Sequence, residues 1–101
     1  MTFGEKLRQL REEKNLMQRQ VGALIEVDGA FVSKIENNDK PINRKHLKTL
    51  SQYFKIPLQQ LETLWLADKV EHIIKDEVSA SQVIIEIQER LKDRLKWILT
   101  L

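Results

Sequence analysis

The fold of this chain is decided by residues 16–37, LMQRQVGALIEVDGAFVSKIEN. Their apolar residues form two sets at helical spacing, Val21, Leu24 and Ile25 in the first and Phe31, Val32 and Ile35 in the second. The first set predicts a short helix over residues 18–25. The second predicts a helix that begins after Asp28, whose carboxylate can accept hydrogen bonds from the free N–H groups of the first turn. The stretch therefore predicts two short helices joined by a tight turn.

The residues on either side extend this helical pattern to five helices. Upstream, Thr2 and Glu5 have the form of a capping box, and apolar residues then recur at helical spacing, which predicts a helix over residues 3–14. Downstream, residues 37–41 predict a loop, and Asn43 can cap a fourth helix. Pro57 suits the first turn of a fifth helix. The apolar positions of these last two helices are Leu47, Leu50, Tyr53 and Phe54, and then Leu58, Leu61 and Leu64.

Residues 67–101 differ from the part before them. Helical spacing persists over residues 65–77, and the pattern leaves open whether this continues the fifth helix or begins a new one. Ser79 and Gln82 then form a second capping box, with Val78 and Val83 as its expected hydrophobic staple. We expect a last helix to begin there and to run to about residue 99.

Composition excludes several classes of protein. The 101 residues are 42% hydrophobic and 32% charged with three Gly and two Pro, which is typical of a soluble, largely helical chain. Without cysteine there is no disulfide scaffold, thiolate zinc site or thiol nucleophile. No apolar run approaches the roughly 18 residues that cross a bilayer, and no signal peptide is recognisable. We therefore expect a cytoplasmic protein that does not bind membranes.

Catalysis is disfavoured by the inventory of side chains. The only histidines, His46 and His72, are far apart in sequence, and Glu71 with His72 lacks the second histidine of a metalloprotease helix. The glycines form no loop that could cradle a phosphate. We expect no enzyme activity, no cofactor and no metal.

Charge is distributed unevenly along the chain. Residues 1–60 hold eleven Lys and Arg against seven Asp and Glu, a net charge of +4, whereas residues 61–101 have a net charge of −2. A basic first part favours a polyanionic partner, although an excess of this size is also common on ordinary solvated surfaces.

Residues 16–22, LMQRQVG, and residues 32–37, VSKIEN, resemble the signature of the Xre or Cro/C1-repressor family of regulators. The resemblance covers about residues 6–61. It implies an all-α protein: a five-helix, lambda-repressor-like helix-turn-helix domain over residues 1–66, with a C-terminal helical extension over residues 67–101. It further implies a bacterial or phage transcription regulator, such as a repressor, that binds double-stranded DNA and places the helix after Asp28 in the major groove.

The resemblance also implies which residues contact bases. Base-reading positions of the family correspond to Gly29, Ala30, Ser33 and Lys34. Gly29 and Ala30 are short, so a close backbone approach or contact with a thymine methyl would replace bidentate hydrogen bonds. Lys34 has two open roles, donation to guanine or contact with a phosphate, and Ser33 can serve several bases.

Phosphate contacts are implied at the start of the first of the two helices and after the second. Gln18 corresponds to the family's phosphate-binding glutamine, and the alternative is that it is a solvated first-turn residue. Arg11 and Glu36 match positions that commonly pair, which would leave Arg11 partly available to phosphate. Removing one partner would cost about 3 to 5 kcal/mol if the pair is buried, because an uncompensated charge remains, and below about 1 kcal/mol if the pair is exposed. The loop supplies further candidates, Asn37, Asn38, Lys40, Asn43 and Arg44.

Three residues depart from the family pattern. Met17 replaces the usual hydroxyl cap, Gly22 stands where alanine is usual, and Glu26 occupies the turn position where glycine is preferred. Glu26 must adopt a left-handed backbone or the turn must differ.

The C-terminal helix carries more apolar residues than one face can bury. We expect it to form a symmetric homodimer, with an interface of Val83, Ile84, Ile87, Leu91, Leu95 and Ile98. One alternative is that it folds back on its own domain, and another is an antitoxin or adaptor whose C-terminal helices bind a partner protein. The sequence does not give the operator, the effector, the regulon, or whether binding represses or activates.

Overall fold

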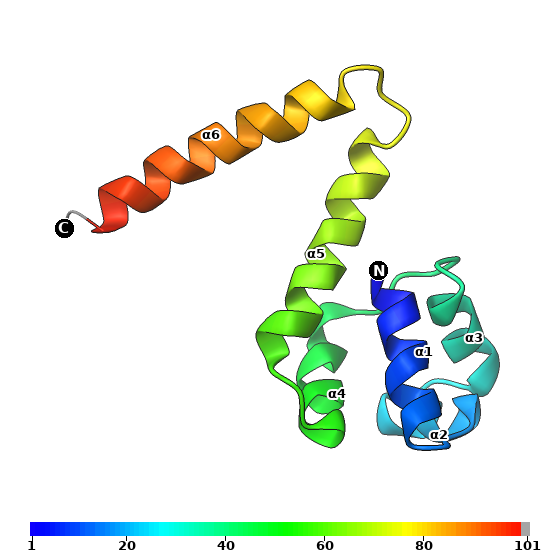
Figure 1. The fold of residues 1–101 in the computed structure, drawn as a ribbon. Helices are drawn as coiled ribbons and strands as arrows, with labels where there is room; N and C mark the ends of the chain where they lie inside the picture. The colour runs from blue at the N-terminus through cyan, green and yellow to red at the C-terminus, as the bar shows by residue number, and fades with distance from the viewer. Residues whose placement is uncertain (100–101) are drawn as a thin grey trace. The chain divides into compact units, whose positions relative to one another are not determined.

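A computed structural model describes the backbone of residues 1–99 and the side chains of residues 1–96. Throughout this range the chain is helical or loop, which confirms the predicted all-α fold with a C-terminal helical extension (Figure 1). The elements are α1 Phe3–Glu13, α2 Gln18–Leu24, α3 Gly29–Glu36, the 3-10 turn η1 Arg44–His46, α4 Leu47–Phe54, α5 Leu58–Ile74 and α6 Ala80–Leu99.

The first three helices begin where their caps predict. The hydroxyl oxygen of Thr2 accepts a hydrogen bond from the N–H of Glu5 at 3.1 Å, and the carboxylate of Asp28 accepts one from the N–H of Phe31 at 2.8 Å. At α2, where Met17 lacks a capping oxygen, the side chain of Gln20 accepts from the Met17 N–H at 2.7 Å. One free N–H at this helix start is thus satisfied from inside the helix.

Four helices end on a residue with left-handed backbone, and none of these residues is glycine. Asn15, Glu26, Asn38 and Lys55 have φ between 55° and 64°. After α1, α2 and α3, the next N–H bonds back to a carbonyl of the last turn, as in a Schellman motif. Glu26 therefore takes the left-handed alternative, in a position that disfavours side chains with a Cβ.

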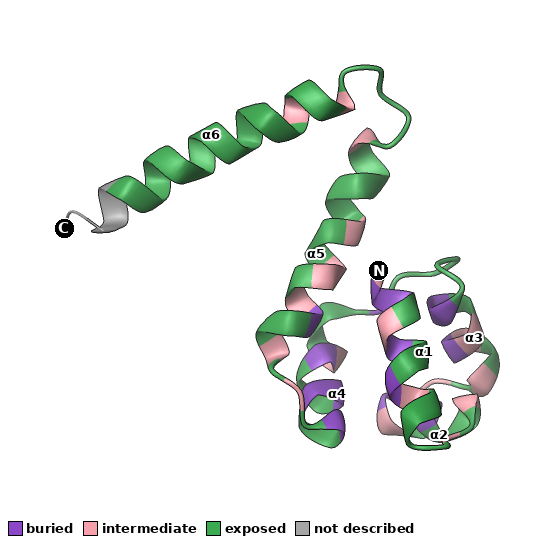
Figure 2. Cartoon of the chain, in the orientation of Figure 1, coloured by how far each residue is buried: buried purple, intermediate pink, exposed green. Residues whose placement is uncertain are grey.

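The hydrophobic core lies entirely within α1 to the first turn of α5 (Figure 2). Leu7 from α1, Val21 from α2, Val32 from α3 and Leu50 from α4 are fully buried, and each lies on the inner face of its helix. The other core members are Phe3, Leu10, Ile25, Ile35, Ile42, Leu47, Phe54 and Leu61. The apolar spacing that predicted the helices also predicted most of the residues that they bury, but the prediction was wrong for Tyr53 in α4, which is 39% exposed.

Helix α5 continues without a break from Leu58 to Ile74, which settles the alternative left open by the sequence. Pro57 lies just before it, and the Pro57 carbonyl accepts from the N–H of Gln60 at 3.0 Å. Two contacts tie α5 to the core: Trp65 Nε1 donates to the carbonyl of Ile42 at 2.8 Å, and Asp68 accepts from the N–H of Phe3 at 3.1 Å. The first compact unit accordingly comprises Met1–Lys69, three residues more than the predicted domain.

The second unit is Val70–Leu101, and it contains α6. Here the predicted staple is wrong, because Val78 is fully exposed at 104% and contacts nothing that would hold the start of α6. The first turn of α6 is bonded by backbone carbonyls: that of Ser79 accepts from the N–H of Val83 at 2.9 Å and that of Glu77 from the N–H of Ala80 at 3.2 Å. None of the helices in the described residues is long and apolar enough to span a membrane.

Candidate nucleic-acid interface

Two glycines allow close contacts around α3: Gly4 brings α1 close to the end of α3, and Gly22 brings α2 close to the turn before α3. A Cβ at Gly22 would collide with the carbonyl oxygen of Val27 in the turn between α2 and α3, so the alanine usual at this position does not fit here. A Cβ at Gly4 would collide with the carbonyl oxygen of Ile35, near the end of α3. Because neither site has room for a methyl group, α3 is held tightly from both sides.

Arg11 and Glu36 form a bidentate ion pair between α1 and the end of α3. Arg11 Nε donates to Glu36 Oε2 at 2.7 Å and Nη2 donates to Oε1 at 3.0 Å. The Glu36 side chain is 2% exposed and that of Arg11 14%, so the buried alternative holds. The hydrogen bond with Glu36 is the main reason that the pKa of the Arg11 guanidinium lies above its ordinary value. Nη1 of Arg11 also donates to the Leu16 carbonyl at 2.8 Å, which leaves Arg11 few hydrogens for phosphate.

The side chain of Gln18 joins this pair. Its Nε2 donates to Glu36 Oε1 at 3.1 Å, which links the first turn of α2 to the end of α3. Because a carboxamide has two N–H hydrogens, one remains for another acceptor. Gln18 is therefore not simply a solvated residue, and its amide can still donate one more hydrogen bond.

One face of α3 is exposed, and the opposite face is buried. Ala30, Lys34 and Asn37 are exposed at spacings of four and three residues, so they form a single stripe along the helix. Ser33 lies half-buried beside this stripe. Val32, Ile35 and Glu36 face the core. The structure therefore brings Ala30, Ser33 and Lys34 together on one accessible surface.

Gly29 lies at the edge of that surface. A Cβ built on it would be 3.1 Å from the backbone nitrogen of Arg19 in α2, so its place for a side chain points toward α2. Only the backbone of Gly29 remains for contact with a base.

The candidate residues of the loop differ in the contacts that their side chains make. Lys40 is exposed, whereas the Asn43 side chain accepts from the Lys45 N–H at 3.0 Å and so caps η1. Arg44 Nη2 donates to Glu62 Oε2 at 2.7 Å, and Arg44 Cζ lies 5.4 Å from the ring centre of Trp65. The ion pair of Arg44 is exposed, so it costs little to break.

Comparison with known proteins identifies the family. A family model described as a helix-turn-helix domain matches residues 4–72. The chain belongs to this helix-turn-helix family. The prediction of an Xre-like helix-turn-helix protein is thereby confirmed.

Three relatives are themselves named as regulators or control proteins. This helix-turn-helix protein is 38% identical over 61 residues to the HTH-type transcriptional activator BcrR of Enterococcus faecalis, covering 60% of this chain and 30% of BcrR. It is 34% identical over 73 residues to the HTH-type transcriptional repressor RghR of Bacillus subtilis (strain 168), covering 71% and 53%. It is 37% identical over 60 residues to the control protein C.MunI of Mycoplasma sp, covering 58% and 81%. No solved structure matches it.

Those coverages limit what the relatives say about this helix-turn-helix protein. The matched part spans less than two thirds of the length of BcrR and of RghR. With C.MunI the match spans most of the relative.

Arg19 was not among the predicted contact residues. It is exposed in the first turn of α2, and its backbone packs against Gly29 at the start of α3. Its positive charge at the start of α2 was the signal in the sequence that could have pointed to a phosphate contact. The contacts of Trp65 and Asp68 were not predicted either, because their partners Ile42 and Phe3 are distant in sequence.

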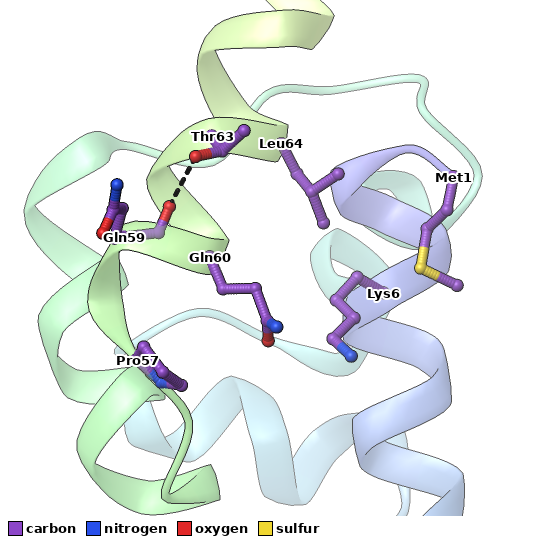
Figure 3. A pocket seen from close by; sticks show the side chains of 7 residues that line it. All are labelled: Met1, Lys6, Pro57, Gln59, Gln60, Thr63 and Leu64. Carbon is purple, nitrogen blue, oxygen red and sulfur yellow. Dashed lines mark hydrogen bonds between the residues drawn. The ribbon is translucent and has the colours of Figure 1, made fainter.

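An open groove of about 510 Å³ lies between α1 and the first turns of α5 (Figure 3). Inside it the Thr63 hydroxyl donates to the Gln59 carbonyl at 2.7 Å. Its lining residues are Met1, Lys6, Pro57, Gln59, Gln60, Thr63 and Leu64. None of them belongs to the candidate interface.

Proposed function

We propose that this chain is a sequence-specific transcription regulator that binds double-stranded DNA with α3 in the major groove. The observation that carries the proposal is the exposed stripe of Ala30, Lys34 and Asn37 on a helix whose other face is fixed by the core and by the Arg11–Glu36 pair. A short helix with one rigid face and one free polar face suits contact with base edges. The relatives named as transcriptional regulators support this function.

In this proposal α3 reads bases with few side chains. Lys34 donates to guanine O6 and N7 or to a phosphate, Ser33 bonds a base edge, and the methyl group of Ala30 meets a thymine methyl. Gly29 contributes its backbone. Asn37 shares the stripe with Ala30 and Lys34, so it contacts either a base or the backbone next to it.

Phosphates would be bound at both ends of the helix pair. At the start of α2, the free N–H of Gln18 and the exposed side chain of Arg19 are available. Beyond α3, the proposed contacts are Asn37, Asn38, Lys40, Asn43 and Arg44. Arg11 acts in this proposal mainly by positioning α3, because its guanidinium is turned toward Glu36.

We further propose that residues 67–101 form a homodimer, which would present two copies of α3 to half-sites about 34 to 36 Å apart. The support is the apolar surface of α6, where Ile84, Ile87, Leu91 and Leu95 are exposed and Val83 is half-buried. The side chain of Ile98, the sixth predicted interface residue, lies outside the described residues. No catalytic role is part of the proposal.

Binding to the DNA upstream of the chain's own gene tests the proposal, with a scrambled fragment as reference. Fluorescence anisotropy at two salt concentrations should show tighter binding to the upstream fragment, with log K falling by about 0.9 per neutralised phosphate for each unit of log salt. Equal, salt-independent binding to both fragments would contradict the proposal.

Lys34→Ala separates the two roles of this residue. Loss of a base contact changes preference among operator variants by about 1 to 3 kcal/mol, whereas loss of a phosphate contact weakens binding to all fragments and lowers the salt slope by about 1. Lys75→Ala is the matched control, since Lys75 is an equally charged, exposed residue in the second unit. It should leave affinity and preference almost unchanged.

The exposed apolar surface of α6 also favours a second candidate, an antitoxin or adaptor that binds a partner protein. The solution state distinguishes them. A stable dimer supports the regulator, and a monomer that aggregates until a partner protein is added supports the second candidate.

A further inference from the structure

Four apolar side chains form a stripe along helix α6. At about 100° per residue, Ile84, Ile87, Leu91 and Leu95 fall within an arc of about 80°. All four are exposed, and none belongs to the buried core. Helices in proteins gain most of their stability from packing an apolar face against another surface. A helix of 20 residues with this stripe therefore needs a partner surface.

The charges beside this stripe divide α6 into two halves of opposite sign. Residues 80–89 contain Glu86 and Glu89 and no Lys or Arg, a net charge of −2. Residues 90–99 contain four basic residues and one acidic residue, a net charge of +3. The pairs Glu86–Arg90 at 3.0 Å and Glu89–Lys92 at 3.5 Å are highly exposed, so they constrain these side chains little.

We propose that α6 pairs with α6 of a second copy of this chain in antiparallel orientation, with the two Leu91 side chains at the centre. This orientation places the acidic half of each helix beside the basic half of the other. A parallel pair would instead place two halves of charge +3 side by side, which is unfavourable. The inference rests on the homodimer of the proposed function and adds the orientation and the register of its helices.

The register follows from the spacing within the stripe. With Leu91 facing its counterpart, Ile87 lies opposite Leu95 of the second copy, since both are four residues from the centre. In a parallel, in-register pair each residue would lie opposite itself. The two arrangements therefore bring different residues within reach of a disulfide.

Cysteine cross-linking distinguishes them, because the chain has no cysteine of its own. Ile87→Cys and Leu95→Cys variants of the full chain are mixed in a glutathione redox buffer, and the covalent dimers are identified by mass. The antiparallel pair predicts that the mixed disulfide dominates. Dominance of the two symmetric disulfides would overturn the inference, as would the absence of any covalent dimer. Ile85→Cys is the control and should not cross-link, because Ile85 lies about 120° around the helix from Leu91, the centre of the stripe.

A second measurement does not depend on disulfide chemistry. Leu91→Glu should raise the dimer dissociation constant at least about 100-fold in sedimentation equilibrium, because one buried leucine is lost from each copy. Ile85→Glu should change it less than about threefold, although Ile85 is as exposed, at 58%, as Leu91 is, at 52%. Equal effects of the two substitutions would overturn the inference.

DNA binding of the unmodified chain is measured separately. If the mixed disulfide forms but the chain does not prefer its upstream DNA, the proposed function fails and the antiparallel pair stands. If the chain binds its DNA as a parallel dimer, the inference fails and the proposed function stands. If it binds its DNA as a monomer, both the antiparallel pair and the proposed homodimer fail, and only DNA binding stands.

Discussion

Replacing Glu36 by glutamine removes the charge of the buried ion pair while keeping the shape of the side chain. Arg11 would then retain its place between α1 and α3 without its buried charged partner, although its Nη1 would still bond the Leu16 carbonyl. Three charge-assisted hydrogen bonds, two from Arg11 and one from Gln18, are weakened or lost, and the site is nearly closed to water. Removing one partner of such a pair costs about 3 to 5 kcal/mol. We expect Glu36→Gln to lower the free energy of unfolding by at least about 3 kcal/mol.

Glu12 supplies a matched control around the same arginine. Its carboxylate lies 3.9 Å from Arg11 Nη2, but its side chain is 56% exposed. Glu12→Gln should therefore cost below about 1 kcal/mol. Urea denaturation followed by circular dichroism, at one fixed chain concentration, measures both variants. The reasoning is refuted if Glu36→Gln costs no more than Glu12→Gln, because the pair would then be screened by water despite its burial.

Other substitutions test single features of the packing. Glu26→Gly should raise the free energy of unfolding by about 0.5 to 1 kcal/mol by relieving the left-handed backbone, whereas Glu26→Ala should bring no gain; equal effects in thermal unfolding would contradict this. Gly22→Ala should lower it by about 1 to 3 kcal/mol, because the methyl group meets the Val27 carbonyl, and an unchanged urea midpoint would show that the turn can yield. Trp65→Phe should lower it by about 1 kcal/mol through loss of the bond to the Ile42 carbonyl, and hydrogen exchange in α5 should rise; unaltered exchange would speak against this anchor.

Helix caps and buried helix faces could be predicted because they depend on residues that are close together in the sequence. Asp28 and Thr2 cap helices through bonds that span three residues, and apolar spacing located the buried face of α1 to α4, with exposed Tyr53 as an exception. The failure at Val78 has the opposite cause. A staple needs a partner positioned by the whole chain, and Val78 is fully exposed.

Features that join distant segments could not be derived from spacing. The bond from the Phe3 N–H to Asp68 crosses 65 positions, and no pattern in either segment signals it. Nor does the sequence show that the Gln18 amide turns toward Glu36. The Arg11–Glu36 pair was expected only because the chain resembles a family in which these positions pair, and its degree of burial needed coordinates.

The close contact between Gly22 in α2 and the turn at Val27 affects the thermodynamics of the proposed DNA complex. Since no methyl group fits between α2 and the turn that leads to α3, the two helices behave as one stiff body before any partner arrives. Little backbone entropy remains to be lost on association. Discrimination between operators would then depend on a few mobile side chains and on the deformability of the duplex itself.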